Sequence, residues 1–223
     1  ALGVFTFADA LPIGTTFAAT GGTDSITGLA YTGTLRAEVS ADVSENVTIS
    51  PITTFAKYLK DERSITYDQA IEATFKSGSY FGLVAPLDYA NRETILKKDY
   101  NAEALNGKSE AIAALAVTTF LEGTAEIMSA YQGGASGVDT RFKDNAYVAM
   151  AKQMATFTSS INLSACLEEV ADDNIEEDLV SSKRQQTNNL LSNFKTGVFS
   201  FADEQDKSSN YLVTQFNGMN RTG

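Results

Sequence analysis

The sequence predicts an α+β protein in which a small N-terminal antiparallel β-sheet packs on a mainly helical bundle. Residues 1–50 are rich in Thr, Gly, Val and Phe in short runs, whereas apolar residues from position 51 onward recur at helical spacing. All three Pro residues lie before position 87, so the C-terminal part holds no Pro that would interrupt a helix. We expect the β-rich segment 1–50 and the helical bundle 51–223 to form one compact unit.

Four short runs in the first fifty residues have the composition of β-strands. They cover residues 4–7, 15–18, 31–39 and 47–50, and the run 31–39 alternates in polarity. Glycines separate the runs, as turn residues do. Because four short strands barely stand alone, we expect them to pack on the helices or to pair with another chain.

The helical region begins at Ser50 and Pro51, where Ser suits the N-cap position and Pro suits the first turn. A second helix is predicted from Thr66 to Phe75, followed by an irregular connection over residues 79–100. Longer helices are predicted over 102–131, 140–161 and 167–194, and an amphipathic piece over 203–217. Spaced apolar residues on the first two of these helices are interpreted as core positions: Ile112, Leu115, Ala116, Phe120, Ile127, Phe142, Met150, Met154, Phe157 and Ile161.

The charge balance and the missing residue types narrow the function. Lys and Arg number 17 against 28 Asp and Glu, and the net charge of −11 disfavours nucleic acid and anionic membrane surfaces as partners. The chain has no His, which removes the commonest general base and transition-metal ligand. The single Cys166 lies in an apolar-leaning stretch, so we expect a buried, unreactive thiol. No run reaches the ~18 apolar residues of a membrane span.

One distinctive segment, residues 20–35, reads TGGTDSITGLAYTGTL, and VTISPITTF follows at residues 47–55. Together they resemble a helical and β module of large bacterial extracellular surface proteins, in which a GGTD…TGTL strand region leads into a VTxxPxTT helix start. The likeness covers residues 15–130 and implies an extracellular, non-catalytic part of an adhesin, surface layer or appendage. The chain departs from the pattern at Ser50-Pro51-Ile52, where Asn or Thr usually precedes Pro and Leu usually follows it.

The densest acidic group is the candidate for a cation site. Asp172, Asp173, Glu176 and Glu177 are the candidate calcium ligands, because hard cations take several oxygen ligands. Their spacing is not that of an EF-hand loop, and a solvated helix face is the simpler interpretation. No Ser-His-Asp set can form without His, and the sequence contains no phosphate-binding loop. Abundant carboxylates leave a paired-acid hydrolase open as an alternative.

These observations favour a structural or adhesive module of an extracellular microbial surface assembly over an enzyme. Its partners would be other copies of itself or another surface protein, joined through an open sheet edge. Val4, Phe5, Thr6 and Phe7 form the run that we expect to exchange between subunits, with an ordinary first strand of its own domain as the alternative. No cofactor is expected apart from calcium. A calcium-dependent ligand-binding module, for example for glycans, is the second hypothesis, and the hydrolase is the third.

Overall fold

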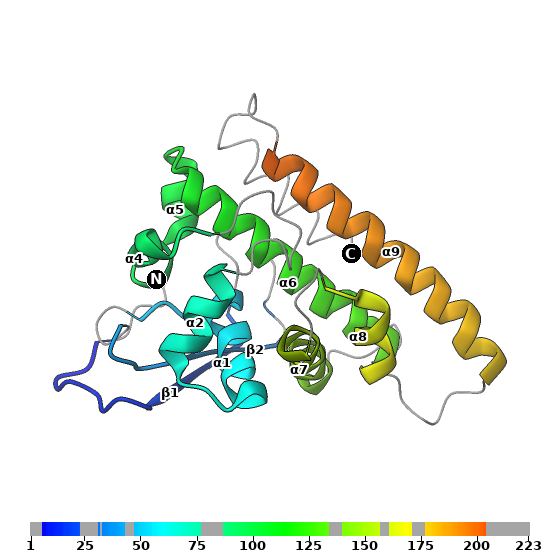
Figure 1. Ribbon diagram of the computed structural model, residues 1–223, viewed down its shortest axis with the longest axis horizontal. Coiled ribbons are helices and arrows are strands. Elements are labelled where there is room, and N and C mark those ends of the chain that lie inside the picture. Colours follow the sequence, from blue (N-terminus) through cyan, green and yellow to red (C-terminus); the bar gives the residue numbers. More distant parts are fainter. Residues whose placement is uncertain are drawn as a thin grey trace.

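The computed structural model describes residues 6–22, 31, 33–42, 47–76, 87–133, 140–156, 161–170 and 177–203. It confirms the α+β class, because a two-stranded antiparallel sheet lies beside helices that make up most of the described residues. The long helix α6 (Ser109–Gly133) runs through the middle of the molecule. Helix α9 (Glu177–Asp203) lies along one side of it, and the β-hairpin with α1 and α2 lies on the other (Figure 1).

The sheet is smaller than the sequence predicts. β1 (Thr16–Thr20) pairs with β2 (Thr34–Glu38), and the described residues contain no further strand. The predicted strand over 47–50 is wrong, because Ser50 caps a helix and the Thr48 N–H donates to the carbonyl of Leu96, at 3.0 Å, rather than to a strand. In the predicted strand over 4–7, residues 6 and 7 belong to no strand, and residues 4 and 5 lie outside the described residues.

Helix α1 (Pro51–Arg63) begins where the sequence predicts. The Ser50 hydroxyl accepts the Thr53 N–H at 3.3 Å, and the Thr53 hydroxyl accepts the Ser50 N–H at 2.8 Å, which forms a reciprocal capping box. Ser64 ends the helix in the left-handed region, with φ of 53°. Helix α2 (Tyr67–Lys76) follows and confirms the second predicted helix.

The segment predicted as an irregular connection contains short helices. The 3₁₀ turn η1 (Tyr89–Asn91) leads into α4 (Arg92–Leu96), and α5 (Tyr100–Leu105) follows. The single helix predicted over 102–131 is therefore two helices, α5 and α6. They separate because Gly107 adopts φ of +79°, a conformation that ends a helix and favours glycine.

The C-terminal helices keep the predicted order but have different ends. Helix α7 (Thr140–Thr156) stops before the predicted end at 161, and Phe157 lies outside the described residues. The helix predicted over 167–194 corresponds to two helices, α8 (Leu163–Val170) and α9. Of the amphipathic piece predicted over 203–217, only residue 203 is described, at the end of α9.

One hydrophobic core joins these helices, and α6 lies at its centre. Most of the predicted core residues are buried, while Ile112 and Phe142 are half-buried. The central position explains why α6 is so apolar. By length and composition Ser109–Gln132 could cross a membrane, yet 78% of its most apolar stretch is buried within the protein. Core helices pass the same test, so the predicted lack of a membrane span remains a prediction.

Candidate functional site

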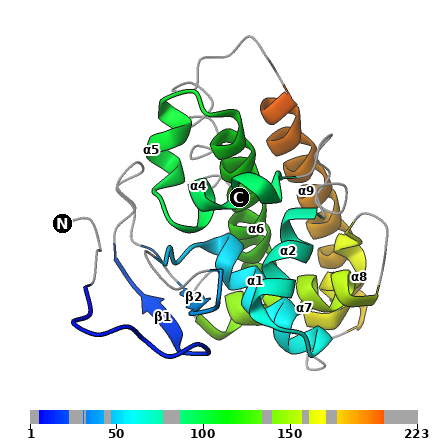
Figure 2. The same ribbon diagram turned by 60° about the vertical axis from the view of Figure 1, so that its left-hand side comes forward.

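The β-hairpin lies at one edge of the molecule, with β1 on the side away from the helices (Figure 2). The strands pair in register from Thr16 opposite Glu38 to Thr20 opposite Thr34. The Val39 N–H donates to the carbonyl of Thr15 at 2.8 Å. Because hydrogen-bonded and non-bonded pairs alternate along an antiparallel ladder, the backbone groups of residues 17 and 19 face β2, and those of residues 16, 18 and 20 face outward.

The far edge of β2 is closed by a helix. The Arg36 N–H, which points away from β1, donates to the hydroxyl of Thr54 on α1 at 2.7 Å. The same hydroxyl lies 3.3 Å from the Arg36 carbonyl oxygen, and Thr54 is fully buried. Within the described residues, no strand pairs with the outer edge of β1. The hairpin therefore has one closed edge and one open edge, and an open edge is a template for strand pairing.

Two exposed apolar side chains precede β1 in the chain, and one of them, Phe7, contacts the strand. Phe7 is 54% exposed and Ile13 is 72% exposed. The ring of Phe7 lies 5.7 Å from that of Phe17 on β1, measured between centroids. Large exposed apolar residues that gather at one place often mark an interaction surface.

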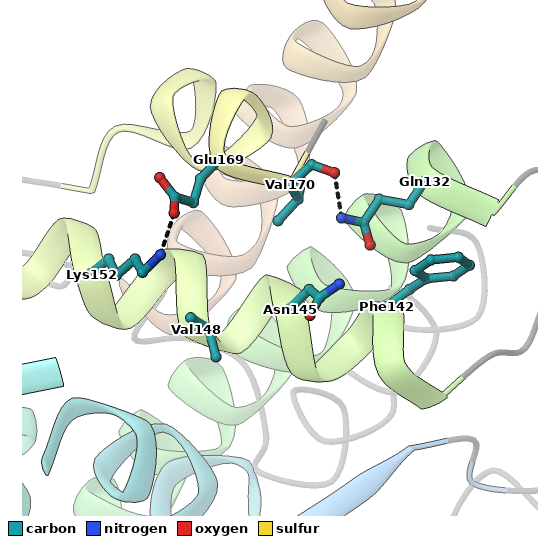
Figure 3. Close-up of a pocket in the computed structure, with 7 residues that line it drawn as sticks. All are labelled: Gln132, Phe142, Asn145, Val148, Lys152, Glu169 and Val170. Carbon is teal, nitrogen blue, oxygen red and sulfur yellow. Dashed lines mark hydrogen bonds and ion pairs between the residues drawn. The ribbon is translucent and has the colours of Figure 1, made fainter. Parts of the chain in front are cut away.

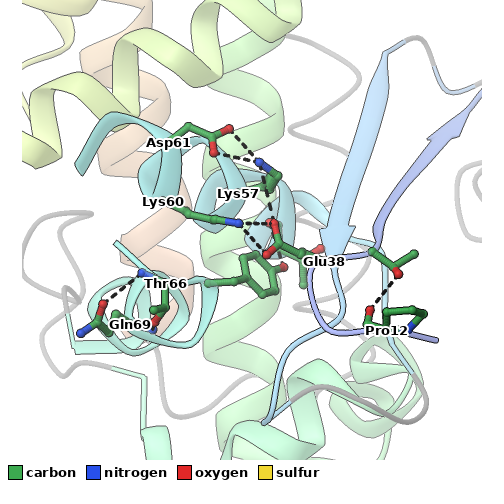
Figure 4. A network of polar contacts seen from close by, with 10 residues as sticks. Pro12, Glu38, Lys57, Lys60, Asp61, Thr66 and Gln69 are labelled. Carbon is green, nitrogen blue, oxygen red and sulfur yellow. Dashed lines mark hydrogen bonds and ion pairs between the residues drawn. The ribbon is translucent and has the colours of Figure 1, made fainter. Parts of the chain in front are cut away.

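Three groups of charged contacts hold the hairpin against the helices, and the first joins β2 to α1 (Figure 4). Both carboxylate oxygens of Glu38 lie 2.6 Å from the Lys60 ammonium. Lys57 lies 3.9 Å from the same carboxylate and 2.8 Å from Asp61. Glu38 is only 4% exposed, so solvent screens the attraction within this ion pair less than it would on the surface.

The second group joins β2 to α7. The Arg36 guanidinium lies 3.2 Å from the Asp144 carboxylate and donates through Nε to the hydroxyl of Tyr58, at 3.1 Å. The rings of Tyr58 on α1 and Tyr147 on α7 stack with centroids 6.2 Å apart. Arg36 thus contacts α1 and α7 at once, which fixes the direction of β2.

The third group, which we call the α6–α7 cluster, consists of Tyr31, Glu122, Glu126, Lys143 and Tyr147. The Lys143 ammonium lies 2.7 Å from Glu122 and 3.0 Å from Glu126. Glu122 also accepts the hydroxyl of Tyr147 at 2.9 Å and that of Tyr31 at 3.4 Å. Lys143 lies 4.8 Å from the centre of the Tyr31 ring. These contacts attach Tyr31, which lies shortly before β2 in the chain, to the core of the bundle.

Burial and charge act in opposite directions within the α6–α7 cluster. Burial of the ammonium lowers the pKa of Lys143, but Glu122 and Glu126 outweigh it, and the pKa is raised overall. Burial raises the pKa of Glu126, against the opposing effect of Lys143. Glu122 is 7% exposed and Lys143 is 5% exposed, so the ammonium pairs with a carboxylate that is buried in the protein interior. This pair of acids therefore lends no support to the hydrolase alternative, which requires two carboxylates in an open cleft.

No known protein family, curated protein or solved structure matches this chain. The likeness to bacterial surface modules therefore stays a prediction from the residues that carry it. Gly33, within that motif, adopts φ of +154°, and a Cβ there would lie 3.0 Å from the side chains of Lys143 and Tyr31. The motif glycine is thus required where the hairpin meets the α6–α7 cluster.

The structure describes few of the predicted site residues. Asp172, Asp173 and Glu176 lie outside the described residues, as do Val4 and Phe5. The remaining calcium candidate, Glu177, is the first residue of α9, and its side chain is outside the description. The described part of the chain contains no group of three or more His, Cys, Asp or Glu that could hold a metal ion.

The prediction of a buried thiol is confirmed. Cys166 lies on the inner face of α8 with no exposed surface. Burial raises the pKa of its thiol to about 12, so the thiol stays protonated at neutral pH.

Alkaline pH is expected to unfold the protein through its buried phenols. Burial is the main cause that raises the pKa of Tyr58 and Tyr100 to about 12, and the pKa values of Tyr31, Tyr67 and Tyr147 shift in the same direction. The phenols of the unfolded chain lose their protons near pH 10, whereas those of the native protein keep them. The contribution of the protonated phenols to folding stability is therefore complete below pH 10 and is lost as the pH rises towards 12. We expect tyrosinate absorbance to appear together with the loss of helical circular dichroism. Full ionisation near pH 10 in a protein that is still helical would contradict this burial.

Proposed function

We propose that this chain is a non-catalytic structural or adhesive module of an extracellular microbial surface assembly, which joins a neighbouring copy through the open edge of β1. The observation that carries the proposal is the asymmetry of the hairpin. Its β2 edge is closed by Thr54, and its β1 edge is left unpaired in the described residues. The resemblance of residues 20–35 and 47–55 to bacterial surface modules, together with the acidic surface, supports the extracellular setting.

The attachment of the hairpin to several helices suits a surface that binds another chain. Charged contacts join β2 to the helices: Glu38 pairs with Lys60 on α1, and Arg36 pairs with Asp144 on α7. Tyr31, shortly before β2, donates a hydrogen bond to Glu122 on α6. A partner strand added to β1 would therefore be linked through β2 to the hydrophobic core. A sheet edge fixed in this way loses little conformational freedom on binding, which favours association.

The occupant we propose is the N-terminal segment of a second copy, which includes Thr6 and Phe7. Phe7 already contacts Phe17 of β1 within the chain and remains 54% exposed. Exchange between two copies would preserve this ring contact, because the same two side chains would meet across the interface. Domain swapping replaces contacts within a chain by identical contacts between chains in this manner and has a low cost.

The test is the mass in solution of the wild type and of Ala18→Pro, measured by light scattering over a range of concentrations. Ala18 is exposed and its N–H points away from β2, so Pro removes a donor from the open edge without removing one from the hairpin. We expect concentration-dependent oligomers of the wild type and a monomer for the variant. Repeating the measurement with calcium and then with a chelator separates this proposal from a calcium-dependent module.

A matched control is Ala18→Ser, which keeps the outward N–H and should associate like the wild type. Ala19→Pro removes an N–H that faces β2 and is expected to weaken the hairpin itself. A wild type that stays monomeric at every concentration, or an Ala18→Pro variant that associates unchanged, would overturn self-association through β1.

A further inference from the structure

A pocket of about 350 Å³ lies between α7 and α8, beside the end of α6 (Figure 3). Its volume falls within the roughly 300–1,000 Å³ typical of small-molecule sites. Phe142 and Val148 on α7 and Val170 on α8 contribute its apolar walls. None of the residues that line the pocket belongs to the hairpin or to the groups that hold it, although α7 contributes residues to both.

Polar groups line the same pocket in a mixed arrangement. Lys152 on α7 and Glu169 on α8 form an ion pair at one end. Asn145 is exposed, and it lies among the residues that line the pocket. Gln132 donates to the carbonyl of Val170, while its own side-chain oxygen is buried and lacks a hydrogen-bond partner among the described residues.

This arrangement selects a class of ligand. The Lys152–Glu169 ion pair has no net charge, so the pocket does not attract an anionic or a cationic ligand electrostatically. The carboxamide of Asn145 offers two hydrogen-bond donors and an acceptor. The Lys152 ammonium adds a donor group, and the Glu169 carboxylate adds an acceptor group. Apolar walls with donors and acceptors between them match a ring that carries hydroxyl groups around its edge and C–H groups on its faces.

We infer that this pocket binds a neutral sugar, with one hexopyranose ring seated against Val170 and its hydroxyls bonded to Asn145 and to the Lys152–Glu169 pair. The inference is independent of self-association through β1, since it uses other residues and none of them belongs to the hairpin. It also requires no calcium, because the side chains of Asn145, Lys152 and Glu169 would bond the sugar hydroxyls directly.

The test uses the methyl glycosides of glucose, galactose and mannose as probes, with saturation-transfer NMR on the full chain in the presence of a chelator. We expect at least one glycoside to bind, with a Kd on the order of 1 mM. Asn145→Leu should weaken that binding roughly tenfold or more, because the carboxamide is lost from the pocket. Asn145 is exposed, so circular dichroism should show an unchanged fold.

The matched control is Asn193→Leu, the same substitution at an exposed position of α9 outside the pocket. It should bind the glycoside as tightly as the wild type. If none of the three glycosides gives a transfer signal, or if Asn145→Leu binds as tightly as Asn193→Leu, the inference is overturned. Neither result would bear on association through β1, which light scattering measures separately.

Discussion

Replacing Lys143 with Met is expected to lower the free energy of unfolding by about 3–5 kcal/mol. Lys143 is 5% exposed and its ammonium contacts Glu122 at 2.7 Å and Glu126 at 3.0 Å. Met fills much the same space, but it leaves the buried Glu122 carboxylate without its cation. The remaining hydroxyl donors, Tyr31 and Tyr147, carry no charge to compensate it. Urea unfolding followed by circular dichroism measures the loss.

Two further variants test whether the loss of stability comes from the broken ion pair or from the loss of the lysine side chain itself. Lys143→Met combined with Glu122→Gln removes the two most buried charges of the cluster. It should recover part of the stability because the carboxylate that remains, on Glu126, is 33% exposed and therefore partly solvated. Lys76→Met makes the same substitution at a side chain that is 64% exposed and pairs with Glu72, and it should cost less than about 1 kcal/mol. An equal loss for Lys143→Met and Lys76→Met would show that the α6–α7 cluster does not stabilise the fold.

Local signals account for the parts of the fold that the sequence predicts well. Ser50 and Pro51 mark the start of α1, and the structure completes that signal with the hydroxyl of Thr53. The Asn106-Gly107 pair is an equally local signal, typical of a helix end, yet the sequence interpretation ran one helix through it. Residues 47–50 have the composition of a strand, but they form none because Ser50 is the N-cap of α1. Capping competes with β-propensity there and prevails.

The candidate site depends on contacts between residues far apart in the chain. Glu122 and Glu126 lie four residues apart in an otherwise apolar helix, which is a signal that a buried partner exists. The partner, Lys143, cannot be identified from the sequence because it depends on how α7 crosses α6. The open edge of β1 is hidden for the same reason. It becomes evident only when Thr54 is seen to close the opposite edge of the sheet.

The crossing of α6 and α9 supplies the second large prediction: Gly123→Val is expected to destabilise the protein by about 3 kcal/mol. A Cβ at Gly123 would lie 2.6 Å from Cε1 and 3.1 Å from Cε2 of the Phe194 ring, closer than packed carbon atoms allow. Phe194 is 9% exposed and lies within the core, so its ring has little room to move away. The substitution should separate the two helices near this point, which urea unfolding and limited proteolysis of α9 would detect.

The reverse change on α9 tests whether the clash is the cause. Phe194→Ala removes the ring and by itself should cost about 3–5 kcal/mol, because it leaves a cavity. Combined with Gly123→Val, it should cost clearly less than the sum of the two single losses, since the new methyl groups enter the space that the ring vacates. Ala130→Val, at an exposed position of the same helix, is the matched control and should cost less than about 1 kcal/mol. Strictly additive losses at Gly123 and Phe194 would mean that the two residues do not meet, and that α9 packs on α6 in another register.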